Sequence, residues 1–324
     1  MITDQFNRVH DYLRISLTER CNLRCFYCMP EEGIRLRPRS ELMSNEEVVE
    51  MAKIFVSLGV KKIRLTGGEP LIRNDAKKIL EDLSKLPVEL AITTNGILVN
   101  DYIDTFRSCG IRSINVSLDS LKKEKFKFIT RRDYFDKVIS NVNLLLKENL
   151  HVKVNAVVIK GVNDDEICDF VEWTRDKNAH VRFIEFMPFD GNKWEWSRGV
   201  SFLEIMTKIK NQFGEDVVRI KDGKNDTAKN FSLRNYAGTF AIISSITNPF
   251  CDTCNRMRLT ADGKMKNCLF SQTETDLLSA MRRGEDIAPL ILETIWEKKK
   301  LRGGIEKMED FSKQKNRTMV AIGG

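Results

Sequence analysis

The stretch Cys21-Asn22-Leu23-Arg24-Cys25-Phe26-Tyr27-Cys28 places three cysteines at a Cys-x3-Cys-x2-Cys spacing. It follows an apolar, β-branched run, residues 12–17, which predicts a buried strand. Cysteine thiolates are the usual ligands of iron–sulfur clusters, four for a cubane. Only three are local here, so a cubane on this loop would keep one iron with an open position, where a substrate or cofactor can bind.

A second set of three cysteines stands far downstream, as Cys251-x2-Cys254-x13-Cys268, and it too has no obvious fourth ligand. A structural zinc site needs four ligands in a closed shell, and disulfides need an oxidising compartment. Two open sets of three therefore favour two iron–sulfur clusters over either alternative. The remaining cysteines, Cys109 and Cys168, lie in helical patterns and fit the role of small buried side chains.

Short apolar runs alternate with helical periodicity along the first part of the chain. We expect strands at residues 12–17, 62–66, 89–93, 113–118, 151–159 and 181–186, and helices at 45–58, 134–148 and 165–177 among the intervening stretches. This alternation predicts a parallel sheet with right-handed crossovers. Six such units are too few for a closed eight-unit barrel. An open six-stranded partial barrel fits the count, and a flat doubly wound sheet would give the same alternation.

The pattern changes after Pro188. A capping box, Ser201-x-x-Glu204, opens a helix to about residue 212, and strands are expected at 231–233 and 239–244. A hairpin turning at Asp262-Gly263 joins 257–260 to 264–267, and helices follow at 275–283 and 287–299. We therefore expect two domains, a partial barrel at residues 1–210 and a smaller α+β part at 211–324 that carries the second cysteine set.

Polar motifs follow the ends of the expected strands. In barrel enzymes the carboxyl ends of the strands form the mouth of the active site. Six motifs at six equivalent ends therefore predict an enzyme rather than a structural protein. Besides the cysteine loop, the motifs are Thr66-Gly67-Gly68-Glu69-Pro70, Thr93-Thr94-Asn95-Gly96, Ser117-Leu118-Asp119, Lys160-Gly161 and Glu185-Phe186-Met187-Pro188.

The 324 residues are 42% hydrophobic and 31% charged, which is typical of a soluble globular protein. We find no apolar run of about 18 residues and no secretory signal, and we expect a protein of the reducing cytoplasm. The net charge is +7, but no basic stretch is interleaved with aromatic residues. A small polyanion is thus a better expected partner than nucleic acid or a membrane surface.

The stretch from Leu13-Arg14-Ile15 through Cys28-Met29-Pro30 resembles the radical S-adenosylmethionine (SAM) enzymes, and more narrowly the GTP 3′,8-cyclases of molybdenum cofactor biosynthesis. The segment 250–268 and the terminal Gly323-Gly324 resemble signatures of the same family, and the resemblance covers nearly the whole chain. It implies the open partial barrel, SAM as cofactor, and two [4Fe-4S] clusters. The metal ligands would be Cys21, Cys25, Cys28, Cys251, Cys254 and Cys268.

The resemblance also implies the roles of individual residues. SAM would be bound by Gly68, Ser117, Met187 and the backbone of Tyr27, with Gly67 beside it. GTP would be bound by Arg14, Arg64, Thr93, Lys160, Arg256 and Arg258, with weaker assignments for Lys62 and Arg182. Independently of the family, Arg256 and Arg258 stand two apart on an expected strand, so they share a face and can grip phosphate together. With Gly323 and Gly324 they form the implied catalytic set.

The implied reaction begins with a 5′-deoxyadenosyl radical that abstracts the ribose 3′ hydrogen of GTP. The carbon radical adds to guanine C8, giving (8S)-3′,8-cyclo-7,8-dihydroguanosine 5′-triphosphate. Implied partners are an electron donor, the downstream cyclic pyranopterin monophosphate synthase and a second copy in a homodimer. Two alternatives stay open: another radical SAM enzyme with an auxiliary cluster, such as a peptide-modifying maturase, and a non-enzymatic metal-binding or electron-carrier protein.

Overall fold

The computed structural model describes residues 1–313 and 315–323. Their strands form one twelve-stranded sheet in the order β12-β11-β10-β1-β2-β3-β4-β5-β6-β9-β8-β7. The strands are β1 (Tyr12–Ser16), β2 (Lys62–Thr66), β3 (Glu89–Thr94), β4 (Ser113–Ser117), β5 (His151–Val158), β6 (His180–Glu185), β7 (Val217–Arg219), β8 (Lys229–Leu233), β9 (Thr239–Ile243), β10 (Arg256–Leu259), β11 (Lys264–Lys266) and β12 (Thr275–Asp276).

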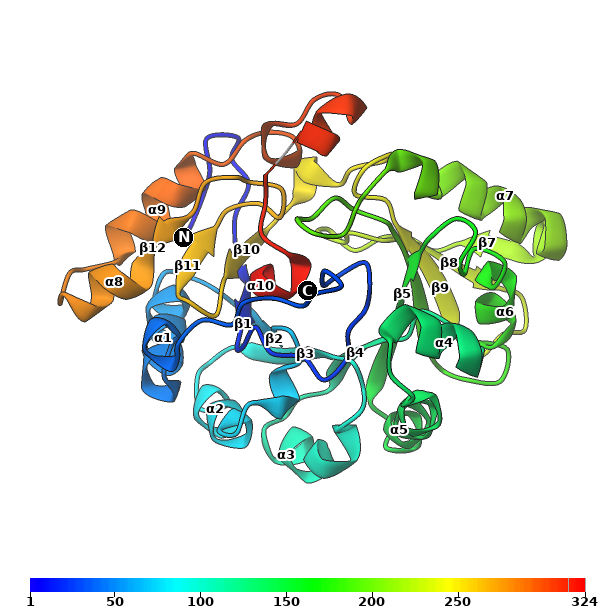
Figure 1. The fold of residues 1–324 in the computed structure, drawn as a ribbon, viewed down its shortest axis with the longest axis horizontal. Helices are drawn as coiled ribbons and strands as arrows, with labels where there is room; N and C mark the ends of the chain where they lie inside the picture. Colours follow the sequence, from blue (N-terminus) through cyan, green and yellow to red (C-terminus); the bar gives the residue numbers. More distant parts are fainter. Residues whose placement is uncertain (314, 324) are drawn as a thin grey trace.

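The sheet curves into an open arc, with helices on its outer side (Figure 1). The helices are α1 (Asn45–Ser57), α2 (Ala76–Leu83), α3 (Ile103–Ser108), α4 (Lys123–Thr130), α5 (Phe135–Lys147), α6 (Ile167–Glu172), α7 (Phe202–Phe213), α8 (Leu277–Arg282), α9 (Ala288–Trp296) and α10 (Met319–Ile322). Of these, α10 lies inside the arc, where the described chain ends (Figure 1).

The predicted open partial barrel is confirmed, but its parallel part is longer than predicted. Strands β1 to β6 run parallel in sequence order, as expected from the alternation of strands and helices. The C-terminal part then adds β10 parallel to β1 and β9 parallel to β6. The six-unit count missed this because neither strand is joined to its neighbour by a local crossover.

Alternation along the strands explains which side chains face inward. In β5 the residues Val152, Val154, Ala156 and Val158 are buried in the core, and the residues between them are more exposed. Because successive side chains of a strand point to opposite faces, Lys153 and its alternating neighbours lie on the inner, concave side. The same rule buries the apolar residues of β1 against the helices and turns its polar ones inward.

The helix α6 is shorter than the helix that the sequence predicts at residues 165–177, since it ends at Glu172. Beyond it, the carbonyl groups of Thr174 and Arg175 accept hydrogen bonds from the N–H groups of Gly238 and Ala237, at 3.0 and 2.8 Å. These tertiary bonds replace helical ones. In the described part of the chain no helix is both long and apolar enough to cross a membrane.

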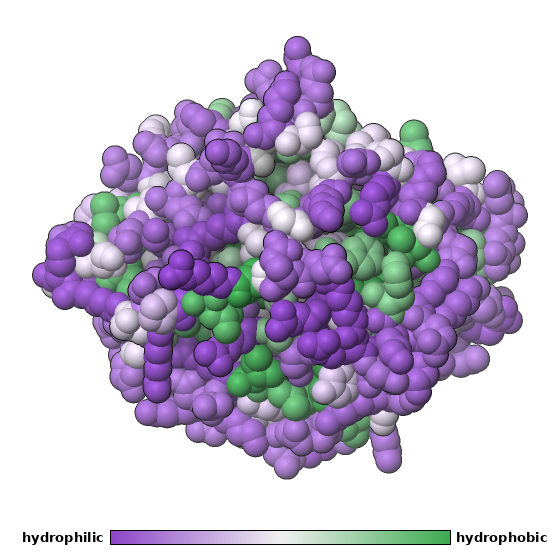
Figure 2. Space-filling model, viewed as in Figure 1, coloured by the Kyte–Doolittle hydropathy of each residue, from purple (hydrophilic) through white to green (hydrophobic). Residues whose placement is uncertain are grey.

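On the face seen in Figure 2, hydrophilic side chains dominate and hydrophobic ones appear in small, separate groups. The apolar side chains instead fill the layer between the sheet and the outer helices, where for example Phe55, Phe106 and Phe183 are fully buried. The rigid sheet therefore presents its polar inner face and the ends of its strands for chemistry.

Candidate active site

Two adjoining cavities occupy the inner side of the arc. The larger, about 310 Å³, is lined by the second cysteine set and by many cations. The smaller, about 170 Å³, is lined by the first cysteine set and by the ends of β2, β3 and β4. Both are lined by Asn155, Ile184, Met187 and Met319, so they meet at these residues. The curvature of the sheet thus brings together the two cysteine sets, which are more than 200 residues apart in sequence.

The first cysteine loop follows β1 and is tied to the end of α4. The N–H groups of Arg24 and Phe26 donate to the carbonyl groups of Thr130 and Ile129, at 2.9 and 3.1 Å. The Cys21 sulfur accepts from the Leu23 N–H at 3.4 Å. Burial raises the pKa of the Cys21 thiol to about 11 and raises those of Cys25 and Cys28 as well. Thiolates here need an adjacent cation such as iron.

The first cysteine set presents three thiols to one cavity. Within residues 1–313 and 315–323, no three His, Cys, Asp or Glu side chains are arranged to hold one metal ion. A mononuclear zinc site of the structural kind would need four converging ligands. Three partly buried thiols that line one cavity are donors of the kind that an iron–sulfur cluster takes, and a cubane on them would keep one open position.

The glycine pair beside this loop has no room for a side chain. A Cβ on Gly68 would lie 2.2 Å from the Arg20 carbonyl oxygen, and one on Gly67 would lie 2.7 Å from the Thr18 oxygen. The following Glu69 is fully buried and accepts hydrogen bonds from the Thr94 hydroxyl at 2.8 Å and the Asn95 N–H at 2.6 Å. It therefore joins the end of β2 to the end of β3. Glycine here keeps two backbone segments in contact beside the cavity.

The smaller cavity is also lined by Ser117, Met187 and Tyr27, which were expected to bind SAM, and by Thr93, which was expected to bind GTP and does not line the larger cavity. The Tyr27 hydroxyl donates to Asp119 at 2.7 Å, so the side chain of this residue, and not only its backbone, faces the site. Burial raises the pKa of Asp119 to about 6. The Thr93 hydroxyl is buried and, among the described residues, has no hydrogen-bond partner. Its polar atom is thus available to a bound molecule.

The second cysteine set lines the larger cavity. The Cys251 sulfur accepts from the Arg302 N–H at 3.3 Å, and the Cys254 sulfur accepts from the Lys298 ammonium at 3.5 Å. Burial acts to raise the pKa of Cys254, but the charges of Lys298 and Arg256 outweigh it and lower the pKa to about 7. Cys254 is therefore electrostatically prepared to be a thiolate.

The larger cavity is strongly positive because arginines from three adjacent strands lie abreast. Arg14 on β1 is in register with Arg64 on β2 and with Arg258 on β10. Burial and then neighbouring cations lower the pKa of Arg258 to about 10 and that of Lys153 to about 8. The lining lysines and arginines are Arg14, Lys62, Arg64, Lys153, Arg182, Arg256, Arg258, Lys298 and Arg302.

Against these cations, Asp226 is the single carboxylate among the described residues that line the larger cavity. Such an excess of one charge is electrostatically unfavourable unless an anion binds. Several guanidinium groups on one wall suit a ligand with several phosphate oxygens. The cavity is therefore built for a polyanion.

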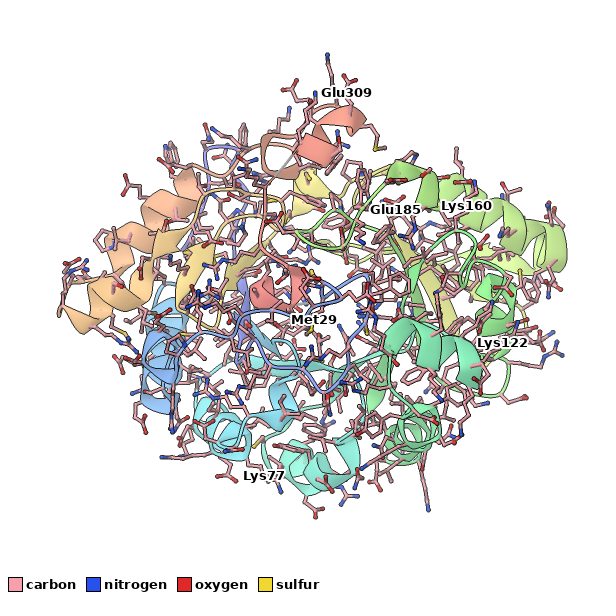
Figure 3. All side chains as sticks on the ribbon, in the orientation of Figure 1. Met29, Lys77, Lys122, Lys160, Glu185 and Glu309 are labelled. Carbon is pink, nitrogen blue, oxygen red and sulfur yellow. The ribbon has the colours of Figure 1, made fainter. Side chains whose placement is uncertain are left out.

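Lys160 is not brought to this wall. Its side chain is 57% exposed and its ammonium lies 3.6 Å from Glu204, beside α7 and away from the centre of the arc (Figure 3). Lys153, which was not among the residues predicted from the sequence, lines the cavity instead, as do Lys298 and Arg302. The alternation of β5 was a usable signal for Lys153. The other two depend on tertiary packing.

The C-terminal segment reaches both cavities. Met319 lines the two of them, and the Gly323 carbonyl accepts a hydrogen bond from Arg258 Nη1 at 2.8 Å. Gly323 has a φ of +91°, and a Cβ there would lie 2.7 Å from Thr66 Oγ1. Gly324 lies outside the described residues. The expected approach of the tail to the strand ends is thus seen as far as Gly323.

Residues 15–174 match the radical SAM superfamily, and residues 179–303 match the family described as Molybdenum Cofactor Synthesis C. The chain is 48% identical to the mitochondrial GTP 3′,8-cyclase of Arabidopsis thaliana, covering 100% of this chain and 84% of the relative. It is 43% identical to the GTP 3′,8-cyclase of Thermodesulfovibrio yellowstonii, covering 90% of this chain and 92% of the relative.

It is also 42% identical to human molybdenum cofactor biosynthesis protein 1, covering 99% of this chain but only 51% of that longer protein. The chain thus spans about half the length of this relative. Among solved structures it is similar to Streptococcus suis SuiB bound to S-adenosylmethionine, with a TM-score of 0.62 and 15% identity, over 97% of this chain and 72% of SuiB. At that identity the likeness concerns the fold.

Proposed function

Because the chain belongs to the GTP 3′,8-cyclase family within the radical SAM superfamily, we propose that it catalyses the 3′,8-cyclisation of GTP, the first step of molybdenum cofactor biosynthesis. One observation carries the proposal. A cavity lined by one cysteine set and a glycine pair adjoins a strongly positive cavity lined by the other set. A radical formed in the first can therefore act on an anionic substrate bound in the second.

Two [4Fe-4S] clusters would be held by Cys21, Cys25, Cys28 and by Cys251, Cys254, Cys268. When bound, the first cluster and SAM supply the 5′-deoxyadenosyl radical by one-electron cleavage of SAM. In the smaller cavity, Gly68, Ser117 and Met187 would line the SAM site. The absence of a side chain at Gly68 keeps this loop against the Arg20 backbone. Tyr27, held by Asp119, closes the side next to the cysteine loop.

In the larger cavity, the arginines of β1, β2 and β10 would bind the triphosphate. Arg256 and Arg258 lie on the strand that follows Cys254, so they would hold phosphate beside the second cluster. A triphosphate held on this wall would keep the ribose within the joined cavities, near their junction at Asn155 and Met319. Ring closure then needs no diffusional encounter, because C3′ and C8 belong to one oriented molecule.

We further propose an electron donor, a downstream cyclic pyranopterin monophosphate synthase and a homodimer as partners of this chain. The division into residues 1–210 and 211–324 also stands as a proposal, with residue 210 lying inside α7. We propose a reducing compartment, the cytoplasm, because all eight cysteines are free in the structure. The plant relative carries "mitochondrial" in its name.

The test is anaerobic turnover of the reconstituted protein with SAM and a strong reductant, with and without GTP, read as 5′-deoxyadenosine and cyclised product. We expect 5′-deoxyadenosine formation to rise steeply when GTP is added. Slow formation indifferent to GTP would keep the radical chemistry and reject the substrate. No formation by protein with a full iron load would reject both.

A further inference from the structure

The tail that reaches the active site is anchored by ion pairs before it enters the arc. From residue 315 it runs inward to α10, and the 3-10 helix η8 (Met308–Lys313) lies upstream at the rim (Figure 1). At its entrance, Arg317 Nη1 and Nη2 lie 2.7 and 3.0 Å from the two carboxylate oxygens of Asp262. Nη2 also donates to Glu274. The Arg317 and Asp262 side chains are only 14% and 6% exposed.

Such a bidentate pair fixes direction as well as distance, because a planar guanidinium matches a carboxylate in one orientation. Asp262 is itself held, since it accepts a hydrogen bond from the Thr260 hydroxyl at 2.6 Å. It occupies the turn between β10 and β11, and β10 is the strand that carries Arg258. The anchor and the residue that meets Gly323 therefore belong to one rigid hairpin.

The preceding residue adds a second anchor. The Asn316 N–H donates to Asp190 at 2.9 Å, and its amide nitrogen donates to the Leu269 carbonyl at 3.0 Å. Its amide oxygen accepts from the buried ammonium of Lys266 at 3.2 Å. Two consecutive residues thus bind the β10–β11 hairpin and the loop after it by side-chain contacts.

Beyond Arg317 the described tail consists of the short helix α10 and Gly323. α10 has four residues, far fewer than a helix needs to be stable by itself. Its order therefore depends on tertiary contacts: Val320, Ala321 and Ile322 are buried, Arg317 anchors the segment just before the helix, and Gly323 meets Arg258 just after it. Between them, Met319 lines both cavities and Val320 packs close to Gly68. A displacement of Arg317 would therefore also displace Met319, Val320 and Gly323.

We propose that Arg317 is a positioning residue of the reaction, whose paired contacts with Asp262 and Glu274 hold the tail so that Met319 lies at the junction of the two cavities and Gly323 lies against Arg258. It touches neither cavity, and it acts through the tail. The inference rests on the proposed function for its catalytic consequence, but the ordering of the tail does not depend on which substrate is used.

Tail order is measured first, by amide hydrogen exchange of the C-terminal peptide in the protein with both clusters. Arg317→Gln and Asp262→Asn should each speed exchange of the amides of residues 319–323 at least tenfold. Iron content and the thermal midpoint show whether each variant is folded. The matched control is Lys313→Ala, which removes an exposed ion pair with Asp310 just upstream and should leave exchange unchanged. Unchanged exchange in folded Arg317→Gln would overturn the proposal.

Turnover is measured second. Arg317→Gln should lower kcat for cyclised product at least tenfold, with a smaller effect on the KM for GTP, and Arg317→Lys should recover part of the loss. A purely structural role would not lower kcat while leaving the KM for GTP nearly unchanged. In a Gly323→Ala background, adding Arg317→Gln should cost little more, because both act through the tail. If the losses in kcat of the two single variants add in the double variant, the positioning role of Arg317 is rejected. If the parent protein forms 5′-deoxyadenosine at the same rate with and without GTP, only the proposed function is rejected.

Discussion

At the scale of single residues, Arg256 and Arg258 are the sharpest test of the polyanion cavity. Arg258 is nearly buried and shares its cavity wall with Arg14 and Arg64. A hydrogen bond to a charged partner contributes about 1.5–3 kcal/mol. We therefore expect Arg256→Ala or Arg258→Ala to lower kcat/KM for GTP by roughly 10- to 100-fold.

Steady-state kinetics of GTP-dependent 5′-deoxyadenosine formation would measure this loss. Arg107→Ala is a suitable control, since Arg107 is exposed on α3 and pairs with Asp104. Unaltered GTP kinetics in both cavity variants would contradict the assignment of the triphosphate to this wall.

The structure and the family resemblance assign different lysines to GTP: the structure favours Lys153, and the resemblance implies Lys160. Lys153 lines the cavity and Lys160 faces Glu204 on the outside. We expect Lys153→Ala to raise the KM for GTP about tenfold, as loss of one charge-assisted contact would. Lys160→Ala should change it less than twofold. The reverse order would favour the sequence-based assignment and require the loop at Lys160 to move inward.

The pH dependence follows from the same residue. Burial, and then the charges of Arg182 and Arg64, lower the pKa of Lys153 to about 8. The protonated ammonium attracts the triphosphate, and it predominates below that pKa. As pH rises through about 8 the charge is lost, so kcat/KM for GTP should fall. Lys153→Arg, which stays charged, should remove this part of the profile, and its persistence there would assign the titration to another group.

At the scale of elements, the loop after β2 depends on the absence of a side chain at Gly68. A Cβ there would overlap the Arg20 carbonyl, which belongs to the backbone of the cysteine loop and cannot rotate away. Overpacking of this kind costs about 1–3 kcal/mol. We expect Gly68→Ala to lower the thermal midpoint and to reduce the iron bound by the first cysteine set.

Iron content and visible absorbance after reconstitution report the second effect directly. Gly110→Ala provides the comparison, because Gly110 has a φ of +65° but a Cβ added there would meet no atom within 4 Å. That change should cost about 1 kcal/mol of backbone strain and leave iron binding intact. Equal iron loss in both variants would show that global stability, and not the loop contact, is responsible.

At the scale of the whole molecule, the C-terminal part completes the sheet. β9 covers the edge of β6, and β10 covers the edge of β1. Uncovered edges expose rows of unpaired N–H and C=O groups and promote aggregation. We therefore expect a fragment of residues 1–213, which keeps α7 whole, to be insoluble or to lack cooperative unfolding.

Size-exclusion chromatography and thermal melts followed by circular dichroism would test this. Co-expression with the remaining residues should recover part of the soluble, folded material, because the missing strands are then available to pair. A fragment that is monomeric and melts cooperatively would show that the partial barrel folds without its second part.

The sequence alone was sufficient for the features that depend on local spacing. The two cysteine sets, the strands at β1 to β6 and the polar motifs at their ends follow from short-range patterns, because side-chain direction and metal ligation repeat over a few residues. The alternation of β5 also carries a local signal for Lys153 and Asn155, which the sequence-based prediction did not use. The resemblance to a family then selected the open barrel over a flat sheet.

What only the tertiary structure decided are the contacts between distant segments. The register of Arg14 with Arg258, the pairing of Arg317 with Asp262 and the outward position of Lys160 have no local signature. Each depends on how separate elements pack once the loops between them have closed, and loop closure is governed by the whole chain. The sequence therefore predicted the cysteine sets and the motifs at the strand ends, whereas the geometry that joins the two cavities to the tail required the tertiary structure.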